Sequence, residues 1–262
     1  MPAVLYEQDG RVATITLNRP DVLNALDPGL ARELFAALQT AGTDDGVRCV
    51  VVRGAGGHFL AGGDIEFFRT QVEQTAATGA DDIASIFEHV HGAIRVVRRM
   101  PKPVIASVSG AAAGFGVSLM AACDLAVSAD NTVFTLAYCH IGASPDGGST
   151  YFLPRIVGLK RTMELVLLGD RFDANTALNM GLVNRVVAAD QLEAETIALA
   201  ERLASGPSTA YSKAKILVNA SLHNDLDTQL DFEQMHFLEC TASDDFVEGV
   251  RAFCEKRRPK FS

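Results

Sequence analysis

An α/β fold is what the sequence predicts, and three consecutive segments near the N-terminus carry that prediction. Residues 12–17 (VATITL) are strand-forming, with partial alternation of apolar and polar side chains. The apolar run 47–54 is typical of a buried strand that ends at a glycine. Between them, Asp27 is a good helix N-cap, and leucines recur every fourth residue from Leu30 along one helix face. A strand, a helix and a strand in succession indicate an α/β architecture.

Similar patterns continue along the rest of the chain. An apolar strand is expected at 104–108, followed by a glycine-rich turn and an apolar segment that reaches Cys123. The polar segment 70–82, rich in small residues, predicts a mobile loop or a weak helix rather than a domain boundary. We expect further strands at 124–129 and 133–135, and helices at 191–204, 210–220 and 225–256. The chain is therefore divided into a core, residues 1–200, and a helical C-terminal region, residues 201–262.

Charge and composition argue against two classes of partner. The 262 residues have a formal net charge of -9, no Trp and only 4 Tyr, so a basic or aromatic face for nucleic acid is poorly supplied. No stretch approaches the ~20 uninterrupted apolar residues that a membrane span needs. The N-terminus lacks a basic segment followed by an apolar run, so no secretory signal is predicted. We expect a cytoplasmic protein that binds neither nucleic acid nor membrane.

The cysteines and histidines indicate neither a disulfide framework nor a metal site. The five cysteines are scattered without CxxC spacing, at Cys49, Cys123, Cys139, Cys240 and Cys254. His58, His91 and His140 have no ligand-like spacing to other metal-binding groups. We therefore expect free thiols in a reducing compartment, and no metal ion.

Two glycine-rich segments follow predicted strands, at 58–64 (HFLAGGD) and 110–116 (GAAAGFG). Such turns can leave backbone N–H groups unpaired, and two N–H groups that converge on one oxygen form an oxyanion hole. The alternative is that the glycines only permit tight turns. Neither segment is a phosphate-binding P-loop, because no Gly-Lys-Ser/Thr follows.

Asp146 stands among small residues (SPDGGST) and has two interpretations. An Asp before small residues is a good helix N-cap. The carboxylate is also a candidate catalytic acid or base. From the residues alone both interpretations stay open.

Five segments resemble motifs of the crotonase (enoyl-CoA hydratase/isomerase) superfamily, and they follow the family's order from about residue 4 to residue 261. They are 18–26 (NRPDVLNAL), 59–65 (FLAGGDI), 102–124 (KPVIA to Asp124), 181–187 (GLVNRVV) and 248–257 (EGVRAFCEKR). The resemblance implies a spiral of ββα units with a C-terminal helical region that serves oligomerisation. It also implies a homotrimer or a hexamer built as a dimer of trimers.

The resemblance further implies an acyl-CoA thioester substrate and no cofactor other than the coenzyme A of that substrate. The thioester oxygen is expected to accept hydrogen bonds from the backbone N–H groups of Gly63 and Phe115. Phe253 and Lys256 match positions that reach CoA from an adjacent subunit. The full set implied to bind substrate or CoA is Ala25, Ala61, Gly63, Asp64, Ile65, Tyr138, Phe253 and Lys256.

The chain departs from the hydratases of this family at two positions. Where they carry two glutamates that hold and activate water, this chain has Ser118 and Tyr138. Ser cannot act as a carboxylate base, and Tyr, with a reference pKa of about 10, is a poor substitute. Simple enoyl-CoA hydration is therefore not expected.

Asp146 instead matches the acid/base carboxylate of several isomerases of the family. Segment 141–155 most resembles the phenylacetyl-CoA ring-epoxide isomerases, which also act as Δ3,Δ2-enoyl-CoA isomerases, and segment 226–231 supports the same branch. The hypothesis is that Asp146 moves a proton from C2 to C4 through a thioester enolate. Such an enzyme serves fatty acid metabolism or aromatic compound degradation.

Two alternatives stay open. Asp146 also matches the attacking aspartate of aroyl-CoA dehalogenases, and His91 falls near their water-activating histidine, although those enzymes have Trp where this chain has Tyr138. In that hydrolase or dehalogenase reading Asp146 is a nucleophile. In the other, the protein binds acyl-CoA without catalysis.

Overall fold

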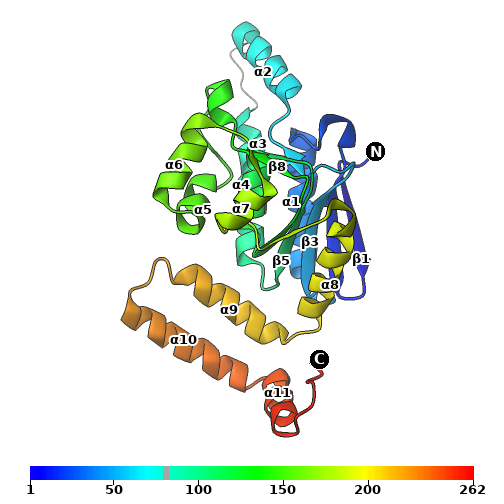
Figure 1. The fold of residues 1–262 in the computed structure, drawn as a ribbon, viewed down its shortest axis with the longest axis vertical. Coiled ribbons are helices and arrows are strands. Elements are labelled where there is room, and N and C mark those ends of the chain that lie inside the picture. Colours follow the sequence, from blue (N-terminus) through cyan, green and yellow to red (C-terminus); the bar gives the residue numbers. More distant parts are fainter. Residues whose placement is uncertain (79–82) are drawn as a thin grey trace.

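Two β-sheets form the centre of the protein in a computed structural model that describes residues 1–78 and 83–262 (Figure 1). The larger sheet has the strand order β1 (Val4–Asp9), β2 (Val12–Leu17), β3 (Cys49–Gly54), β5 (Val104–Val108), β7 (Leu125–Ala129) and β10 (Arg185–Val187). The β1–β2 pair is antiparallel, and every later pair in this sheet is parallel. The strands expected at the N-terminus, at 47–54 and at 104–108 are thus confirmed.

A smaller sheet lies beside the larger one and places the candidate site. Its strand order is β4 (Leu60–Ala61), β6 (Ala111–Ala113), β8 (Val133–Thr135) and β9 (Phe172–Asp173). Strands β4 and β6 are parallel, and Ala61 stands opposite Ala113. Consecutive strands alternate between the two sheets: β3, β5 and β7 belong to the larger one, while β4, β6 and β8 belong to the smaller. With the helices that follow them, they build the spiral of ββα units.

Helices cover both faces of the larger sheet. Val50 and Val52 of β3 pack in one apolar cluster with α1 (Pro28–Thr43) and α3 (Ile83–Arg99). Val51, which points to the opposite face, packs in a second cluster with α8 (Leu192–Ala204). This two-sided burial explains why β3 is a continuous apolar run rather than an alternating one. Asp27 caps α1 as expected, because its Oδ1 accepts a hydrogen bond of 2.7 Å from Leu30 N–H.

Shorter helices connect the strands. They are η1 (Pro20–Val22), α2 (Ile65–Thr78), α4 (Phe115–Ala122), η2 (Tyr138–Ile141), α5 (Ser149–Ile156), α6 (Leu159–Leu168), α7 (Ala174–Asn179) and η3 (Ala189–Gln191). The segment expected as a loop or weak helix, 70–82, is helical in α2 up to Thr78, and residues 79–82 lie outside the described part. No helix in residues 1–78 and 83–262 is both long and apolar enough to cross a membrane.

Three helices follow the layered part: α9 (Ser208–Ala220), α10 (Leu226–Thr241) and α11 (Asp244–Cys254). Figure 1 shows them extending beyond the sheets, with α9 nearest to the core. The helical spacing expected over 225–256 is divided into α10 and α11, because Ser243 caps a new helix by accepting from Phe246 N–H at 3.2 Å. The helical C-terminal region is present as predicted, and residues 201–262 as an oligomerisation unit stay a prediction.

Candidate active site

The two glycine-rich loops lie next to each other. The parallel pairing of Ala61 with Ala113 is followed by a close approach of Gly62 and Gly114, which immediately precede Gly63 and Phe115. The backbones touch there: a Cβ added to Gly114 would lie 3.4 Å from Gly62 Cα. Gly62 and Gly114 also have φ values of +87° and +49°, which side chains other than hydrogen rarely permit. The positive φ values therefore favour glycine at both positions.

The N–H groups of Gly63 and Phe115 are available to a ligand. In the part of the chain that the structure describes, neither group donates a hydrogen bond to a protein acceptor. Phe115 is the first residue of α4, and N–H groups in the first turn of a helix have no acceptor within that helix. The helix dipole adds partial positive charge at the same end. Two such N–H groups at neighbouring register positions can stabilise an anionic oxygen.

The carboxylate of Asp146 is held by a tyrosine. Tyr138 Oη donates a hydrogen bond of 2.5 Å to Asp146 Oδ1. The main-chain carbonyl of Asp146 accepts from Ser118 Oγ at 2.9 Å and from Ser149 Oγ at 3.0 Å. The N-cap of α5 is Gly148, with no side-chain cap hydrogen bond. The interpretation of Asp146 as a side-chain helix cap is therefore wrong, and its carboxylate is free for other roles.

Burial and two neighbours set the proton affinity of Asp146. Loss of solvent raises the pKa of the Asp146 carboxyl, while the hydrogen bond from Tyr138 and the charge of His91 lower it, with a net rise. Burial, reinforced by the charge of Asp146, also raises the pKa of Tyr138, so Tyr138 stays protonated and remains a donor. A half-buried carboxylate with a raised pKa can both accept and return a proton.

The structure brings the three predicted catalytic residues together. A Cβ added to Gly147, next to Asp146, would lie 2.7 Å from the Phe115 ring and 2.9 Å from Ser118 Cβ. A Cβ on Gly114 would lie 3.6 Å from Cζ of Tyr138, whose hydroxyl contacts Asp146. The turn with Asp146 thus lies against the start of α4, where the two free N–H groups are. This arrangement combines one acid/base group with an anion-stabilising pair.

Four of the residues expected to bind CoA lie along the first glycine loop. Leu26 forms a parallel β-bridge with Gly63, and its N–H donates to the Gly62 carbonyl at 2.7 Å, which brings the segment with Ala25 alongside this loop. The carboxylate of Asp64 is already occupied. Its Oδ2 pairs with Arg19 at 2.9 Å, and its Oδ1 accepts from Glu66 N–H at the start of α2. Ile65, by contrast, is 60% exposed and free to contact a ligand.

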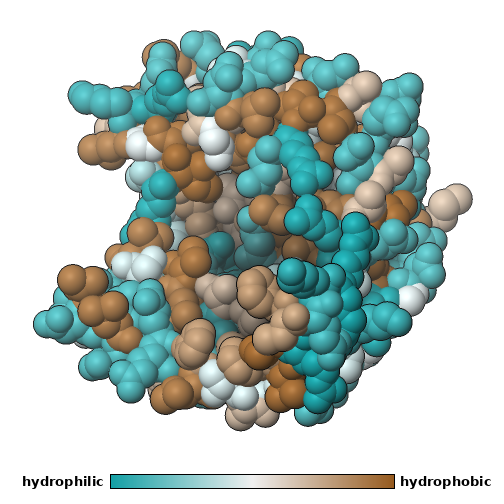
Figure 2. Space-filling model, turned by 60° about the horizontal axis from the view of Figure 1, so that its bottom comes forward, coloured by the Kyte–Doolittle hydropathy of each residue, from teal (hydrophilic) through white to brown (hydrophobic). Residues whose placement is uncertain are grey.

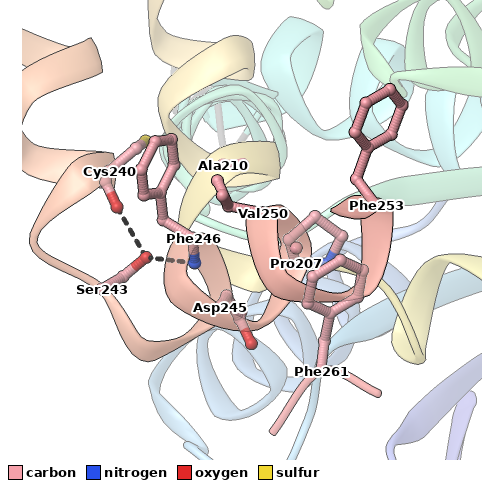
Figure 3. Close-up of a pocket in the computed structure, with 10 residues that line it drawn as sticks. Pro207, Ala210, Cys240, Ser243, Asp245, Phe246, Val250, Phe253 and Phe261 are labelled. Atoms are coloured by element: carbon pink, nitrogen blue, oxygen red, sulfur yellow. Dashed lines mark hydrogen bonds between the residues drawn. The ribbon is translucent and has the colours of Figure 1, made fainter. Parts of the chain in front are cut away.

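Phe253 and Lys256, in contrast, are not brought to this site within one chain. Figure 1 places α11 beyond α9, away from α4 and α5. Phe253 is 85% exposed, and Lys256 follows α11 with a φ of +55°. Figure 3 shows a pocket on α9 and α11 in which the Phe253 ring points away from Pro207 and Phe261.

Sequence reasoning missed how Tyr138 and His91 act on Asp146. Tyr138 was assigned to substrate binding, whereas its hydroxyl is committed to the carboxylate. His91, half-buried on α3 with its ring 5.3 Å from that of Phe87, acts electrostatically on the same carboxyl. No local pattern identifies either contact, since Tyr138 reaches Asp146 only because Ala137 and Gly142 both have positive φ and turn the chain.

Comparison with known proteins supports the same family assignment. A family model described as enoyl-CoA hydratase/isomerase matches residues 7–262. The chain is 35% identical to the 1,2-epoxyphenylacetyl-CoA isomerase of Escherichia coli, over 100% of this chain and 99% of that protein. It is 35% identical to the trans-2-decenoyl-[acyl-carrier-protein] isomerase of Streptococcus mutans, over 99% and 97%. It is 38% identical to a probable enoyl-CoA hydratase of Rhodobacter capsulatus, over 99% and 97%.

Solved structures share the fold along the whole chain. An enoyl-CoA hydratase from Polaromonas superimposes with a TM-score of 0.92 at 34% identity, over 99% of each chain. An enoyl-CoA hydratase from Mycobacterium smegmatis gives a TM-score of 0.90 at 32% identity, over 100% of this chain and 99% of that one. The predicted crotonase-like spiral with a C-terminal helical region is thereby confirmed.

Proposed function

This chain belongs to the enoyl-CoA hydratase/isomerase family, and we propose that within it the protein is an acyl-CoA isomerase that moves a double bond by shuttling one proton through Asp146. One observation carries the proposal: a carboxylate with a raised pKa lies beside two free N–H groups, while the glutamate positions of the hydratases hold Ser118 and Tyr138. Rearrangement of a ring epoxide by the same carboxylate belongs to the proposal, since it also needs an acid/base group beside a stabilised thioester enolate.

The mechanism begins with the substrate oxygen between the two N–H groups. The thioester carbonyl of a 3-enoyl-CoA accepts hydrogen bonds from Gly63 and Phe115, and Asp146 removes a proton from C2. The C–H electron pair becomes a dienolate whose charge rests on the thioester oxygen. Each N–H donor of this kind typically lowers the barrier by about 2.7–4 kcal/mol. Asp146 then returns the proton to C4, which leaves the double bond between C2 and C3.

Isomerisation suits this site better than hydration because the Asp64 carboxylate of the first loop is paired with Arg19, which leaves Asp146 as the acid/base group beside the start of α4. A hydratase must activate a water molecule, and neither the Ser118 hydroxyl nor a Tyr138 hydroxyl with a raised pKa is a base near neutral pH. An isomerase needs no second base, because the residue that takes the proton also returns it. Two of the relatives are isomerases by name, which supports this choice.

We further propose that CoA lies along the first loop and that the active unit is an assembly. Ala25, Ala61 and Ile65 contact CoA, whereas Asp64 contributes through its main chain. Phe253 and Lys256 reach the CoA bound by an adjacent subunit of a cytoplasmic homotrimer or hexamer. Exposed apolar side chains on the C-terminal helices support an assembly, and Figure 2 shows hydrophobic side chains around a hollow on that side. The exposed apolar side chains of α10 and α11 include Leu226, Leu230, Met235, Phe237, Leu238, Phe246, Val247 and Val250.

A spectrophotometric assay tests the isomerase. The purified protein is given a 3-enoyl-CoA, and the formation of the conjugated 2-enoyl thioester is followed beside an Asp146→Asn variant. We expect conjugation by the wild type and a loss of about 10³-fold in the variant, within the range for a positioned acid/base group. No conjugation, despite demonstrated binding of the thioester, would exclude simple enoyl isomerisation and direct the assay to ring-epoxide substrates.

The position of His91 favours one other candidate. A histidine that acts on Asp146 could activate water against an aspartyl ester, as a thioester hydrolase or dehalogenase with a nucleophilic aspartate requires. Both chemistries are lost in Asp146→Asn, but only the nucleophilic route leaves a covalent adduct on Asp146. Mass spectrometry of the enzyme during turnover of a halogenated aroyl-CoA distinguishes the two. Binding without any turnover would instead indicate a non-catalytic acyl-CoA binder.

A further inference from the structure

Hydroxyl groups hold Asp146 at both its main chain and its side chain. Ser118 on α4 is fully buried, and its Oγ donates to the main-chain carbonyl of Asp146 at 2.9 Å. Tyr138 on η2 donates to the side-chain Oδ1 at 2.5 Å. The aspartate is thus fixed through both its backbone and its carboxylate by residues from two different elements.

The distances decide which acceptor each hydroxyl proton takes. Ser118 Oγ and Tyr138 Oη are 3.4 Å apart, which is long for a bond between two hydroxyls. Each has a closer acceptor on Asp146, so the Ser118 proton goes to the carbonyl and the Tyr138 proton goes to Oδ1. Within residues 1–78 and 83–262, no other residue donates a hydrogen bond to Oδ2. The two carboxylate oxygens of Asp146 are therefore not equivalent.

We propose that Tyr138 is a positioning residue of this enzyme: its hydroxyl holds Oδ1 of Asp146, so that Oδ2 is the oxygen that takes and returns the substrate proton. This inference rests on the proposed function, and it changes the role assigned to Tyr138 from substrate binding to control of the base. A carboxylate that can rotate presents its reacting oxygen at a variable distance from the substrate. A carboxylate held at Oδ1 presents Oδ2 to the substrate in a single orientation.

The groups around Asp146 predict how the loss of Tyr138 affects titration. Tyr138 approaches from η2 and His91 from α3, and both lower the pKa of Asp146 against the effect of burial. The start of α4 and the start of α5 contribute Ser118 and Ser149, whose hydroxyls do not titrate. Removal of the Tyr138 hydroxyl therefore raises the pKa of Asp146 further. A base must be ionised to act, so the acidic limb of the pH–rate profile moves to higher pH.

The test compares Tyr138→Phe with Tyr151→Phe. Tyr151, on α5, also has its hydroxyl in a side-chain hydrogen bond, 2.6 Å from His223 Nε2, and this bond lies outside the site. For Tyr138→Phe we expect kcat on a 3-enoyl-CoA to fall about 10- to 100-fold, the scale of a misplaced reacting group. We expect KM to stay within about twofold, because the binding residues are intact, and the acidic limb of kcat/KM to move to higher pH. Tyr151→Phe should leave all three quantities unchanged.

Three results would overturn the proposal. A kcat within about twofold of wild type with an unmoved acidic limb would show that the hydrogen bond does not control the base. A rise in KM alone would return Tyr138 to substrate binding. A lower kcat with an unmoved acidic limb, in a variant whose thermal unfolding matches wild type, would indicate a packing role.

A second readout separates this proposal from the proposed function. With ¹³C-labelled aspartate, the Asp146 carboxyl signal is identified by its absence in Asp146→Asn and is titrated by NMR in wild type and in Tyr138→Phe. We expect a higher pKa in Tyr138→Phe, whatever reaction the enzyme catalyses. If the wild type is inactive on the 3-enoyl-CoA but the Asp146 pKa still rises in Tyr138→Phe, the isomerase proposal is rejected and the role of the Tyr138–Asp146 hydrogen bond is retained. Equal pKa values in both proteins would reject the positioning role itself.

Discussion

Two aspartates of this protein have their carboxylates withdrawn from water, and they differ in what holds them. Asp124, just before β7, pairs with Lys215 of α9, and its Oδ2 accepts from Nζ at 2.7 Å. Asp146 is held by the neutral hydroxyl of Tyr138. Burial raises the pKa of both carboxyls, and it lowers the pKa of Lys215, while the attraction between Lys215 and Asp124 opposes these shifts. Desolvation therefore acts on an ion pair at Asp124 and on a carboxylate with a neutral hydrogen-bond partner at Asp146.

The difference teaches what each partner does to a buried carboxylate. Lys215 also donates to the carbonyls of Val97 at 2.7 Å and Lys102 at 3.0 Å, so its ammonium group ties α9 to the core. The charge of Lys215 lowers the pKa of Asp124 against the larger effect of burial. Asp146 has a neutral hydroxyl, that of Tyr138, as its hydrogen-bond partner instead of an ammonium group. The first arrangement fastens a helix, and the second is suited to proton transfer.

The largest expected effect is on stability at the Asp124 region. Asp124→Asn leaves the Lys215 ammonium, whose side chain is only 8% exposed, without a counter-ion. Breaking a buried pair in this way typically costs about 3–5 kcal/mol. We expect a loss of that size in the free energy of unfolding, measured with urea. The double variant Asp124→Asn/Lys215→Met should recover part of it; no recovery would mean that the loss is not due to the stranded charge.

The next effect concerns the pH dependence of the Asp146 region. The folded protein raises the pKa of Asp146, and the base is active only when ionised. Activity should therefore be lost as the pH falls through a value above about 4, the ordinary value for an aspartate. The measurement is the pH profile of kcat/KM, which reports the free enzyme. An acidic limb of the kcat/KM profile at the ordinary aspartate pKa would show that burial does not raise the pKa of Asp146.

A smaller effect is expected on stability at Asp146. The raised pKa means that the folded state binds the proton more tightly than the unfolded state, so ionisation of Asp146 at neutral pH lowers stability. Asp146→Asn removes that charge, and its amide oxygen can still accept from Tyr138. We expect the free energy of unfolding to stay within about 1 kcal/mol of wild type or to rise. A loss as large as that of Asp124→Asn would remove the distinction between the two regions.

The smallest effect is on thiol reactivity, which reports local opening. Cys49 and Cys123 are buried within reach of the charge of Asp124, and burial raises the pKa of each thiol to about 12. The exposed Cys254 should react at once with a thiol reagent, whereas Cys49 and Cys123 should react only after the protein opens locally. We expect their labelling to accelerate in Asp124→Asn and to match wild type in Asp146→Asn. Equal rates in all three proteins would show that the Lys215 pair does not hold this region closed.

Much of this molecule was predictable because its signals are local. The apolar run of β3 and the Asp27 cap of α1 follow from propensities within a few residues. The two glycine loops were recognised as candidate turns, and the order of the family motifs marked Gly63, Phe115 and Asp146 as members of one site. Local reasoning could not choose between capping and catalysis for Asp146, because an Asp before small residues satisfies both patterns.

Sequence alone predicted the fold class, most of the elements and the family, and it proposed the residues of the candidate site, since each depends on short-range patterning or on motif order. Only the tertiary structure decided how those residues are held. The Asp124–Lys215 pair joins positions 91 residues apart, and Tyr138 meets Asp146 from η2, which is flanked by two residues of positive φ, Ala137 and Gly142. Such hydrogen bonds are set by register and packing, which fix distances to fractions of an ångström and leave no periodic trace along the chain.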